Sequence, residues 1–98
     1  MQQSFLHTIQ QCLAPLPIEK AWLFGSYSRG EETKESDVDL LVRFDSNASI
    51  TLFQYAHMVD ALQKALHRAV DLVEEGQVKE FAKESVERDK VLVYERKS

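Results

Sequence analysis

The sequence has one cysteine, no long apolar run and no excess of positive charge, and each absence excludes a class of protein. Cys12 can form neither an internal disulfide nor a cysteine metal cluster, so we expect it to pack in a cytoplasmic protein. The apolar runs are only a few residues long and no charged-then-apolar leader opens the chain, which argues against membrane insertion and secretion. Twelve bases face sixteen acids without a basic stretch, which argues against a protein that binds long nucleic acids.

The 98 residues are enough for one hydrophobic core, and we expect a single domain over 1–98. Apolar residues at helical spacing predict helices over 2–13, 51–68 and 77–90. In the second and third helices, Leu52 and Phe81 lie on the apolar stripes that we expect to face the sheet. Short apolar runs at 21–24, 40–42, 70–73 and 91–94 predict strands.

The most informative stretch joins a Gly-Ser turn to a pair of acids. Gly25 and Ser26 follow one apolar run, ten residues intervene, and Asp37 and Asp39 then lead into the next apolar run. The spacing therefore predicts two neighbouring strands whose shared end carries the polar groups. One side of such an end suits a polyphosphate, and the other suits the divalent metal that accompanies it.

The turn after the first strand has the features of a phosphate site. Gly25 lets the backbone approach a ligand closely, and Ser26 is a good cap for a short helix whose free N–H groups would point at an anion. Arg29, three residues on, offers a planar fork of donors for a phosphate, and Tyr27 lies beside the turn, where it would wall the pocket. The alternative is an ordinary turn glycine, a plain cap and a solvated charge.

The two acids that lead into the second apolar run are candidate metal ligands. Because side chains alternate along a strand, Asp37 and Asp39 point to the same face. Two like charges so close call for a cation, and Mg²⁺ accepts carboxylate oxygens together with substrate phosphates. Alternatively, Asp37 closes a turn and Asp39 faces solvent.

A third acid interrupts the strand at 70–73. Val70 and Leu72 take one face of this strand and leave Asp71 on the other. If this strand lies beside the one that carries Asp39, the three carboxylates share a face and suit a site with two metal ions. The alternative is an acid near the surface at a strand edge.

The motif resembles a known family. The Gly25-Ser26 pair, ten residues, and then Asp37-Val38-Asp39 look like the signature of the DNA polymerase β-like nucleotidyltransferase superfamily, and the length looks like its minimal branch. The resemblance covers nearly the whole chain and places the third carboxylate of that superfamily on Asp71. It implies transfer of AMP from ATP to a hydroxyl of a small helical HEPN protein, a ribonuclease toxin that such chains counteract as antitoxins.

Together these observations predict an α/β (α+β) fold, a small mixed sheet with helices on one face and three aspartates on the other. The predicted activity is metal-dependent nucleotidyl transfer. Asp37, Asp39 and Asp71 are the predicted catalytic and metal-binding residues for two Mg²⁺ ions. Gly25, Ser26 and Arg29 are predicted to bind the nucleoside triphosphate. Two alternatives stay open: a non-catalytic regulatory module that binds nucleotide or a partner protein, and a metal phosphohydrolase. An oligomer with the partner protein is a further expectation.

Overall fold

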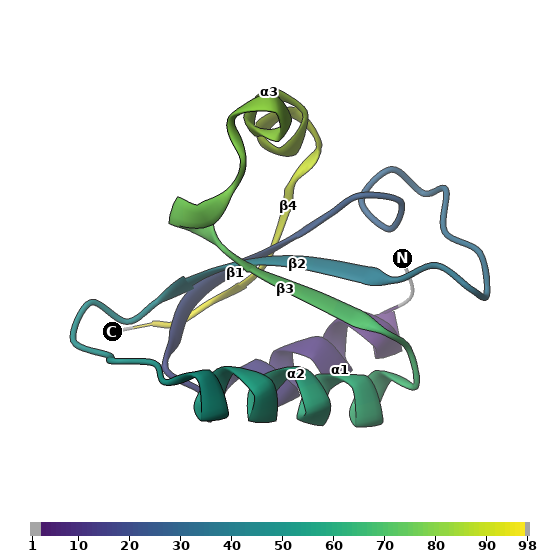
Figure 1. Ribbon diagram of the computed structural model, residues 1–98. Coiled ribbons are helices and arrows are strands. Elements are labelled where there is room, and N and C mark those ends of the chain that lie inside the picture. Colours follow the sequence, from purple (N-terminus) through teal and green to yellow (C-terminus); the bar gives the residue numbers. More distant parts are fainter. Residues whose placement is uncertain (1–2, 98) are drawn as a thin grey trace.

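A computed structural model describes residues 3–97, which form four strands, three α-helices and one 3₁₀ turn (Figure 1). Along the chain these are α1 (Gln3–Leu13), β1 (Ile18–Phe24), β2 (Val38–Phe44), α2 (Leu52–Leu66), β3 (Val70–Glu74), η1 (Glu75–Gln77), α3 (Glu80–Asp89) and β4 (Val91–Glu95). Every predicted strand and helix is confirmed within a few residues. Gln2, the first residue of the predicted first helix, lies outside the described residues.

The four strands form one sheet in the order β3-β2-β1-β4. β1 runs antiparallel to both β2 and β4, whereas β2 and β3 are parallel. The sheet is therefore mixed, as predicted, and the predicted fold class is confirmed. This order makes β3 an edge strand and brings the end of β1 next to the beginnings of β2 and β3.

The larger core lies between the sheet and helices α1 and α2, which cover its lower face in Figure 1. The helices contribute Ile9, Leu13, Met58, Leu62 and Leu66, and the sheet contributes Val38, Leu40, Val42, Val70 and Leu72. Alternate residues of β2 and β3 thus face this core, as strand periodicity predicts. Thr51 begins α2 with a capping box, because its side chain and that of Gln54 each accept a hydrogen bond from the other residue's backbone N–H.

The third helix departs from the prediction that the helices cover one face. α3 lies over the opposite face of the sheet, where Val86 packs with Trp22 and Leu41 in a second, smaller cluster (Figure 1). Two predicted core residues are also wrong: Leu52 is 86% exposed at the start of α2, and Phe81 is 87% exposed on α3. The predicted apolar stripes are wider than the buried faces of these helices. The buried residues are Met58, Leu62 and Leu66 in α2 and Val86 in α3.

None of the helices within residues 3–97 has the length and hydropathy that crossing a bilayer requires.

Candidate active site

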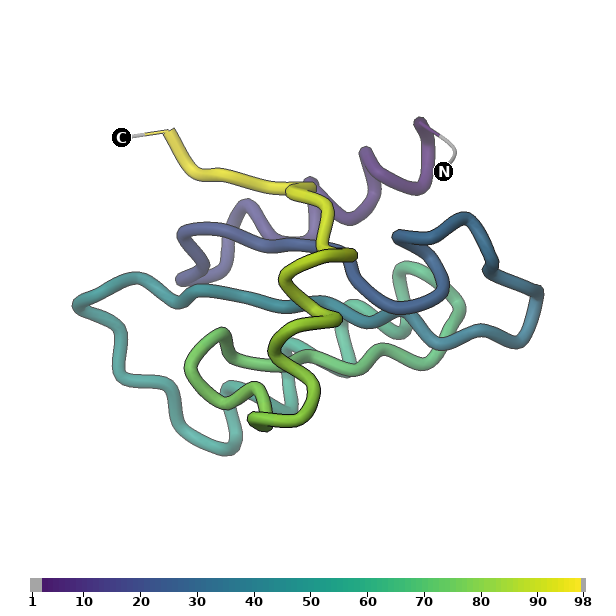
Figure 2. Tube along the Cα trace, turned by 90° about the horizontal axis from the view of Figure 1, so that it is seen from above, coloured from purple at the N-terminus to yellow at the C-terminus, as the bar shows by residue number. Residues whose placement is uncertain are grey.

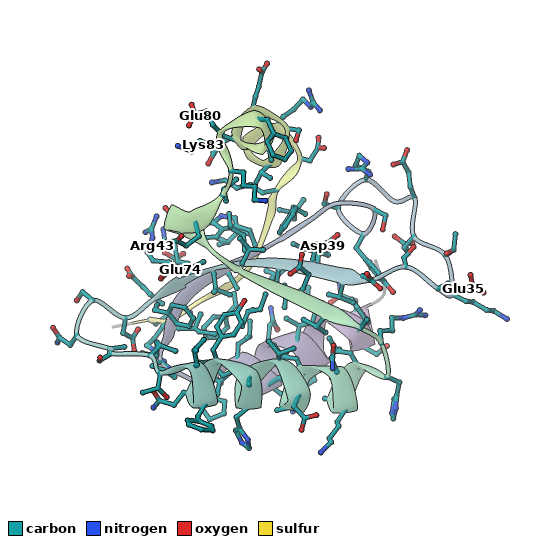
Figure 3. All side chains as sticks on the ribbon, viewed as in Figure 1. Glu35, Asp39, Arg43, Glu74, Glu80 and Lys83 are labelled. Carbon is teal, nitrogen blue, oxygen red and sulfur yellow. The ribbon has the colours of Figure 1, made fainter. Side chains whose placement is uncertain are left out.

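Two of the three predicted acids meet across the parallel pair of strands. Asp39 is directly opposite Asp71 in the register of β2 and β3. Because their neighbours Val38, Leu40 and Leu72 are buried against α1 and α2, both carboxylates project from the other face, where Asp39 is seen in Figure 3. Asp37 immediately precedes β2 and is exposed. The condition for a three-carboxylate site, that β3 lies beside β2, is therefore met.

The phosphate-type turn touches this pair of acids. Gly25 follows β1, whose last residue Phe24 is opposite Asp39. A Cβ atom placed on Gly25 would lie 2.3 Å from Asp39 Oδ2, so only glycine leaves room for the carboxylate in its present position. Gly25 also has a φ of 73°, a conformation that residues with a side chain rarely adopt. The turn and the acid thus depend on each other sterically.

The turn itself is not a helix, which corrects the prediction that a short helix begins at Ser26. Residues 25–30 form consecutive turns, closed by backbone bonds from Arg29 N to Gly25 O (3.3 Å) and from Glu31 N to Ser26 O (2.9 Å). The Ser28 hydroxyl donates to the Gly25 carbonyl at 2.8 Å. The second positive φ, 71° at Gly30, turns the chain away before a helical ladder can extend. Figure 2 shows this blue segment turning back on itself.

Arg29 lies within electrostatic reach of the acids but holds other partners. Its guanidinium donates to Glu31 at 2.5 Å and to Asp89 at 3.4 Å, the latter at the end of α3. Its positive charge nevertheless opposes the rise in the pKa of Asp39 that burial and the other acids cause. To bind a phosphate, Arg29 would exchange these exposed ion pairs, each a weak interaction in water, for a phosphate oxygen. The contact between Arg29 and Asp89 could not be predicted from the sequence, because the two residues lie far apart along the chain.

The site is electrostatically prepared for a cation. Asp39 is half-buried, and burial is the main cause that raises its pKa above the ordinary value, followed by repulsion from Asp71 and from Asp37. The attraction of Arg29 opposes this effect without cancelling it. Ionisation of such a carboxyl group is costly when it is alone and becomes favourable when a cation binds beside it.

The carboxylates of the candidate site are of the ligand type that a divalent metal ion binds. Three carboxylates supply the hard oxygen ligands that Mg²⁺ prefers, and their mutual repulsion is relieved by a cation. No group of three or more His, Cys, Asp or Glu side chains in residues 3–97 is already arranged to hold an ion. Asp37 and Asp71 are both exposed, whereas Asp39 is half-buried.

Tyr27 does not wall a pocket, which corrects another expectation. It is only 8% exposed and stacks on Phe5, with ring centroids 5.1 Å apart and ring planes 7° apart. The Arg68 guanidinium lies 5.9 Å from the centroid of the same ring. Tyr27 therefore anchors the turn to α1, a long-range contact that no local pattern predicts.

Comparison with known proteins agrees with this geometry. The model of the nucleotidyltransferase domain family matches residues 7–93. A "putative protein adenylyltransferase" of Methanocaldococcus jannaschii is 40% identical over 72 residues, which span 72% of each chain. The protein adenylyltransferase MntA of Thermococcus cleftensis is 36% identical over 76 residues, 78% of this chain and 75% of the relative.

A solved structure shares the fold. It contains a tri-AMPylated HEPN toxin of Shewanella oneidensis in complex with its MNT antitoxin. The match has a TM-score of 0.73 and 22% identity, and covers 98% of this chain and 74% of the other. Enzymes that transfer nucleotidyl groups generally use divalent metals, in keeping with the acidic site. From the matched residues 7–93, the acids on β2 and β3 and the turn that touches them, we conclude that the chain belongs to the nucleotidyltransferase domain family.

Proposed function

We propose that this chain is a protein adenylyltransferase that moves AMP from ATP to a hydroxyl of a HEPN-type toxin and so acts in the cytoplasm as its antitoxin. The observation that carries the proposal is the register of Asp39 opposite Asp71, with the Gly25 turn against Asp39. The names of the relatives support the choice of an adenylyl group, and the AMPylated HEPN toxin in the related complex supports the choice of acceptor.

The roles of the residues follow from their order across the sheet. Gly25 and Ser26 hold the triphosphate at the end of β1, where a close backbone approach is sterically open, and Arg29 binds a phosphate oxygen. Three acids would hold magnesium as two ions: Asp37, Asp39 and Asp71. The bound metal would supply positive charge that neutralises the phosphates. Asp71, on the outer side of Asp39, orients the attacking hydroxyl.

The chemical step is a displacement at the α-phosphorus. A bond forms between the acceptor hydroxyl oxygen and the α-phosphorus, and the bond from that phosphorus to the bridging oxygen of the pyrophosphate breaks. The hydroxyl proton passes to the carboxylate of Asp71, and the pyrophosphate leaves on the side of the Gly25 turn. The protein supplies positioning and charge, which are the main sources of rate in such transfers.

The test is to co-express the chain with a HEPN toxin and to analyse the toxin by intact mass spectrometry. We expect the mass of the toxin to increase by one or more adenylyl groups. When the purified chain, the unmodified toxin and ATP are mixed, EDTA should prevent this increase. Release of free AMP without a labelled acceptor would instead indicate a phosphohydrolase. ATP binding without either product would indicate a regulatory binding module.

A further inference from the structure

The outer edge of β3 is open to a further strand. Val38 N donates to the Ala69 carbonyl at 2.9 Å on the β2 side, whereas Val70 N points the other way and donates to Gln63 Oε1 at 3.1 Å. Because the polar groups of successive strand residues alternate sides, the N–H and C=O groups of Leu72 and Glu74 also face away from β2. The sheet order places no strand of residues 3–97 on that side.

A groove of about 460 Å³ runs along this edge. Four consecutive residues of β3 form one wall, and the beginning of α2 with the end of β2 forms the other. The lining residues are Phe44, Ile50, Thr51, Leu52, Tyr55, Asp71, Leu72, Val73, Glu74 and Gln77. A groove between a strand edge and a helix is the shape in which proteins bind an extended peptide by adding it to the sheet.

The groove begins at the active site and lies on its acceptor side. Asp71 lines it, whereas Gly25, Ser26 and Asp39 do not, so the groove lies beyond Asp71 as seen from the phosphate turn. On a strand added to β3, the residue opposite Asp71 would have its Cβ about 4.5–5.5 Å from that of Asp71, on the same face. A hydroxyl side chain at that position would reach the carboxylates.

The lining selects the character of the segment. Two charged residues line the groove, and both are acidic: Asp71, which the proposed function assigns to magnesium and the hydroxyl, and Glu74, whose charge remains to attract a basic segment. Tyr55 lines the same groove, and its pKa is raised first by burial and then by the charges of Asp71 and Glu74. Leu52 contributes an apolar rim that is 86% exposed in the free chain. Basic and apolar side chains complement this surface.

We propose that the groove beside β3 binds the acceptor protein as an extended, basic segment that adds to the edge of the sheet and presents its hydroxyl opposite Asp71. This inference rests on the proposed function for the nature of the acceptor. It assigns acceptor recognition to backbone hydrogen bonds at Leu72 and Glu74, to the Leu52 rim and to the charge of Glu74.

Binding is tested with a fluorescent peptide of sequence Lys-Thr-Lys-Val-Tyr-Val-Lys-Thr-Lys and a matched peptide with glutamate in place of each lysine. The lysine peptide should bind at least about tenfold more tightly and should slow the exchange of the Leu72 and Glu74 amides in NMR. Leu52→Glu and Glu74→Lys should each weaken its binding by about tenfold. Phe53→Glu is the matched control, because Phe53 is 89% exposed beside Leu52 but lies outside the groove.

Three results would overturn the proposal: no protection of the two amides, equal binding of both peptides, or an equal loss of binding in Phe53→Glu. Protection of the amides that depends on protein concentration without peptide would assign the edge to a second copy of the chain and would also overturn it. The proposed function fails separately, if the HEPN toxin gains no adenylyl group while the groove still binds the peptide.

Discussion

At the scale of single residues, the active-site turn depends on the absence of one Cβ atom. Gly25 and Gly30 have nearly the same backbone conformation, with φ of 73° and 71°, but their surroundings differ. A Cβ on Gly25 would meet Asp39 Oδ2, whereas a Cβ on Gly30 would meet no atom within 4 Å. Substitutions at the two positions therefore distinguish the cost of backbone strain, common to both, from displacement of the Asp39 carboxylate, which occurs only at Gly25.

We expect Gly30→Ala to lower the free energy of unfolding by about 1–2 kcal/mol, the cost of a left-handed conformation for alanine. Gly25→Ala should cost at least as much and should also move the Asp39 carboxylate, weakening magnesium-triphosphate binding by about tenfold or more. Urea denaturation and calorimetry with a non-hydrolysable triphosphate measure the two effects. Equal triphosphate affinities in the two variants would place the nucleotide away from Gly25.

Asp71 differs from Asp39 in its expected kinetic effect. Asp71 is exposed and lies on the acceptor side, so we expect Asp71→Asn to remove the group that accepts the hydroxyl proton while leaving the triphosphate contacts in place. The transfer rate should fall by about a hundredfold or more, the scale of a lost general base, with little change in nucleotide affinity. The matched control is Glu32→Gln, which removes an equal charge from an exposed loop position. Full modification of the HEPN toxin by Asp71→Asn would exclude Asp71 from the site.

At the scale of elements, an ion pair ties the 3₁₀ turn after β3 to the neighbouring strand. Arg43 on β2 donates to both carboxylate oxygens of Glu75, at 2.8 and 3.0 Å, and its guanidinium lies 5.4 Å from the centre of the Trp22 ring. The hydrogen bonds from Arg43 are the largest cause that lowers the pKa of Glu75 below 4.5. The pair thus holds η1 against the sheet at the far end of the groove.

We expect Glu75→Gln to lower the free energy of unfolding by about 0.5–1 kcal/mol at neutral pH, because the pair is partly exposed. Since the pKa is lowered in the folded state, this contribution is complete above the unfolded-state pKa and is lost as the pH falls through the folded-state pKa. The difference between wild type and variant should therefore vanish under acidic conditions. Thermal melts at pH 7 and pH 3 measure it, and a constant difference would assign the effect to packing.

Element types and their order could be predicted from the sequence because they depend on local patterns. The alternation in β2 and β3 predicted which of their side chains face α1 and α2, and hence the shared face of Asp39 and Asp71. It did not predict that Leu41, on the face of Asp39, is buried as well. Contacts between remote segments could not be predicted in this way. Periodicity places Leu52 and Phe81 on apolar stripes, but only the positions of the helices on the sheet decide that both remain exposed.

The turn at residues 25–30 shows the same limit. Its spacing from the aspartates predicts a phosphate site, whereas its conformation depends on partners that are distant in sequence. Tyr27 is fixed by Phe5, and Arg29 is paired with Asp89 at the end of α3. Sequence alone predicted a helix there because Ser26 is a good N-cap, but capping is a local preference that the positive φ of Gly30 overrides.

At the scale of the whole molecule, the two hydrophobic clusters lie on opposite faces of one sheet and share its strands. We therefore propose that the chain unfolds as one cooperative unit, a single domain. Trp22 and Leu41 belong to strands whose alternate residues form the larger core, so loss of one cluster disorders the backbone that supports the other. The candidate active site adjoins the smaller cluster, because Gly25 follows Phe24, which packs against that cluster. Ligand binding there should therefore stabilise the whole molecule.

The last prediction concerns this linkage between ligand and fold. At a magnesium-triphosphate concentration of about one hundred times the dissociation constant, binding should add about 2.7 kcal/mol to the free energy of unfolding. For a domain of this size the melting temperature should then rise by about 10 °C or more.

Asp39→Asn should remove the shift, because it removes the half-buried carboxylate that a cation would neutralise. Without metal, the same variant should melt at the wild-type temperature or slightly above it, since repulsion from Asp71 and Asp37 is relieved. Differential scanning calorimetry with and without EDTA tests both halves, with Glu32→Gln as the control for loss of one charge. A lower melting temperature of Asp39→Asn in EDTA would show that the carboxylate stabilises the fold, and a retained ligand shift would place the metal elsewhere.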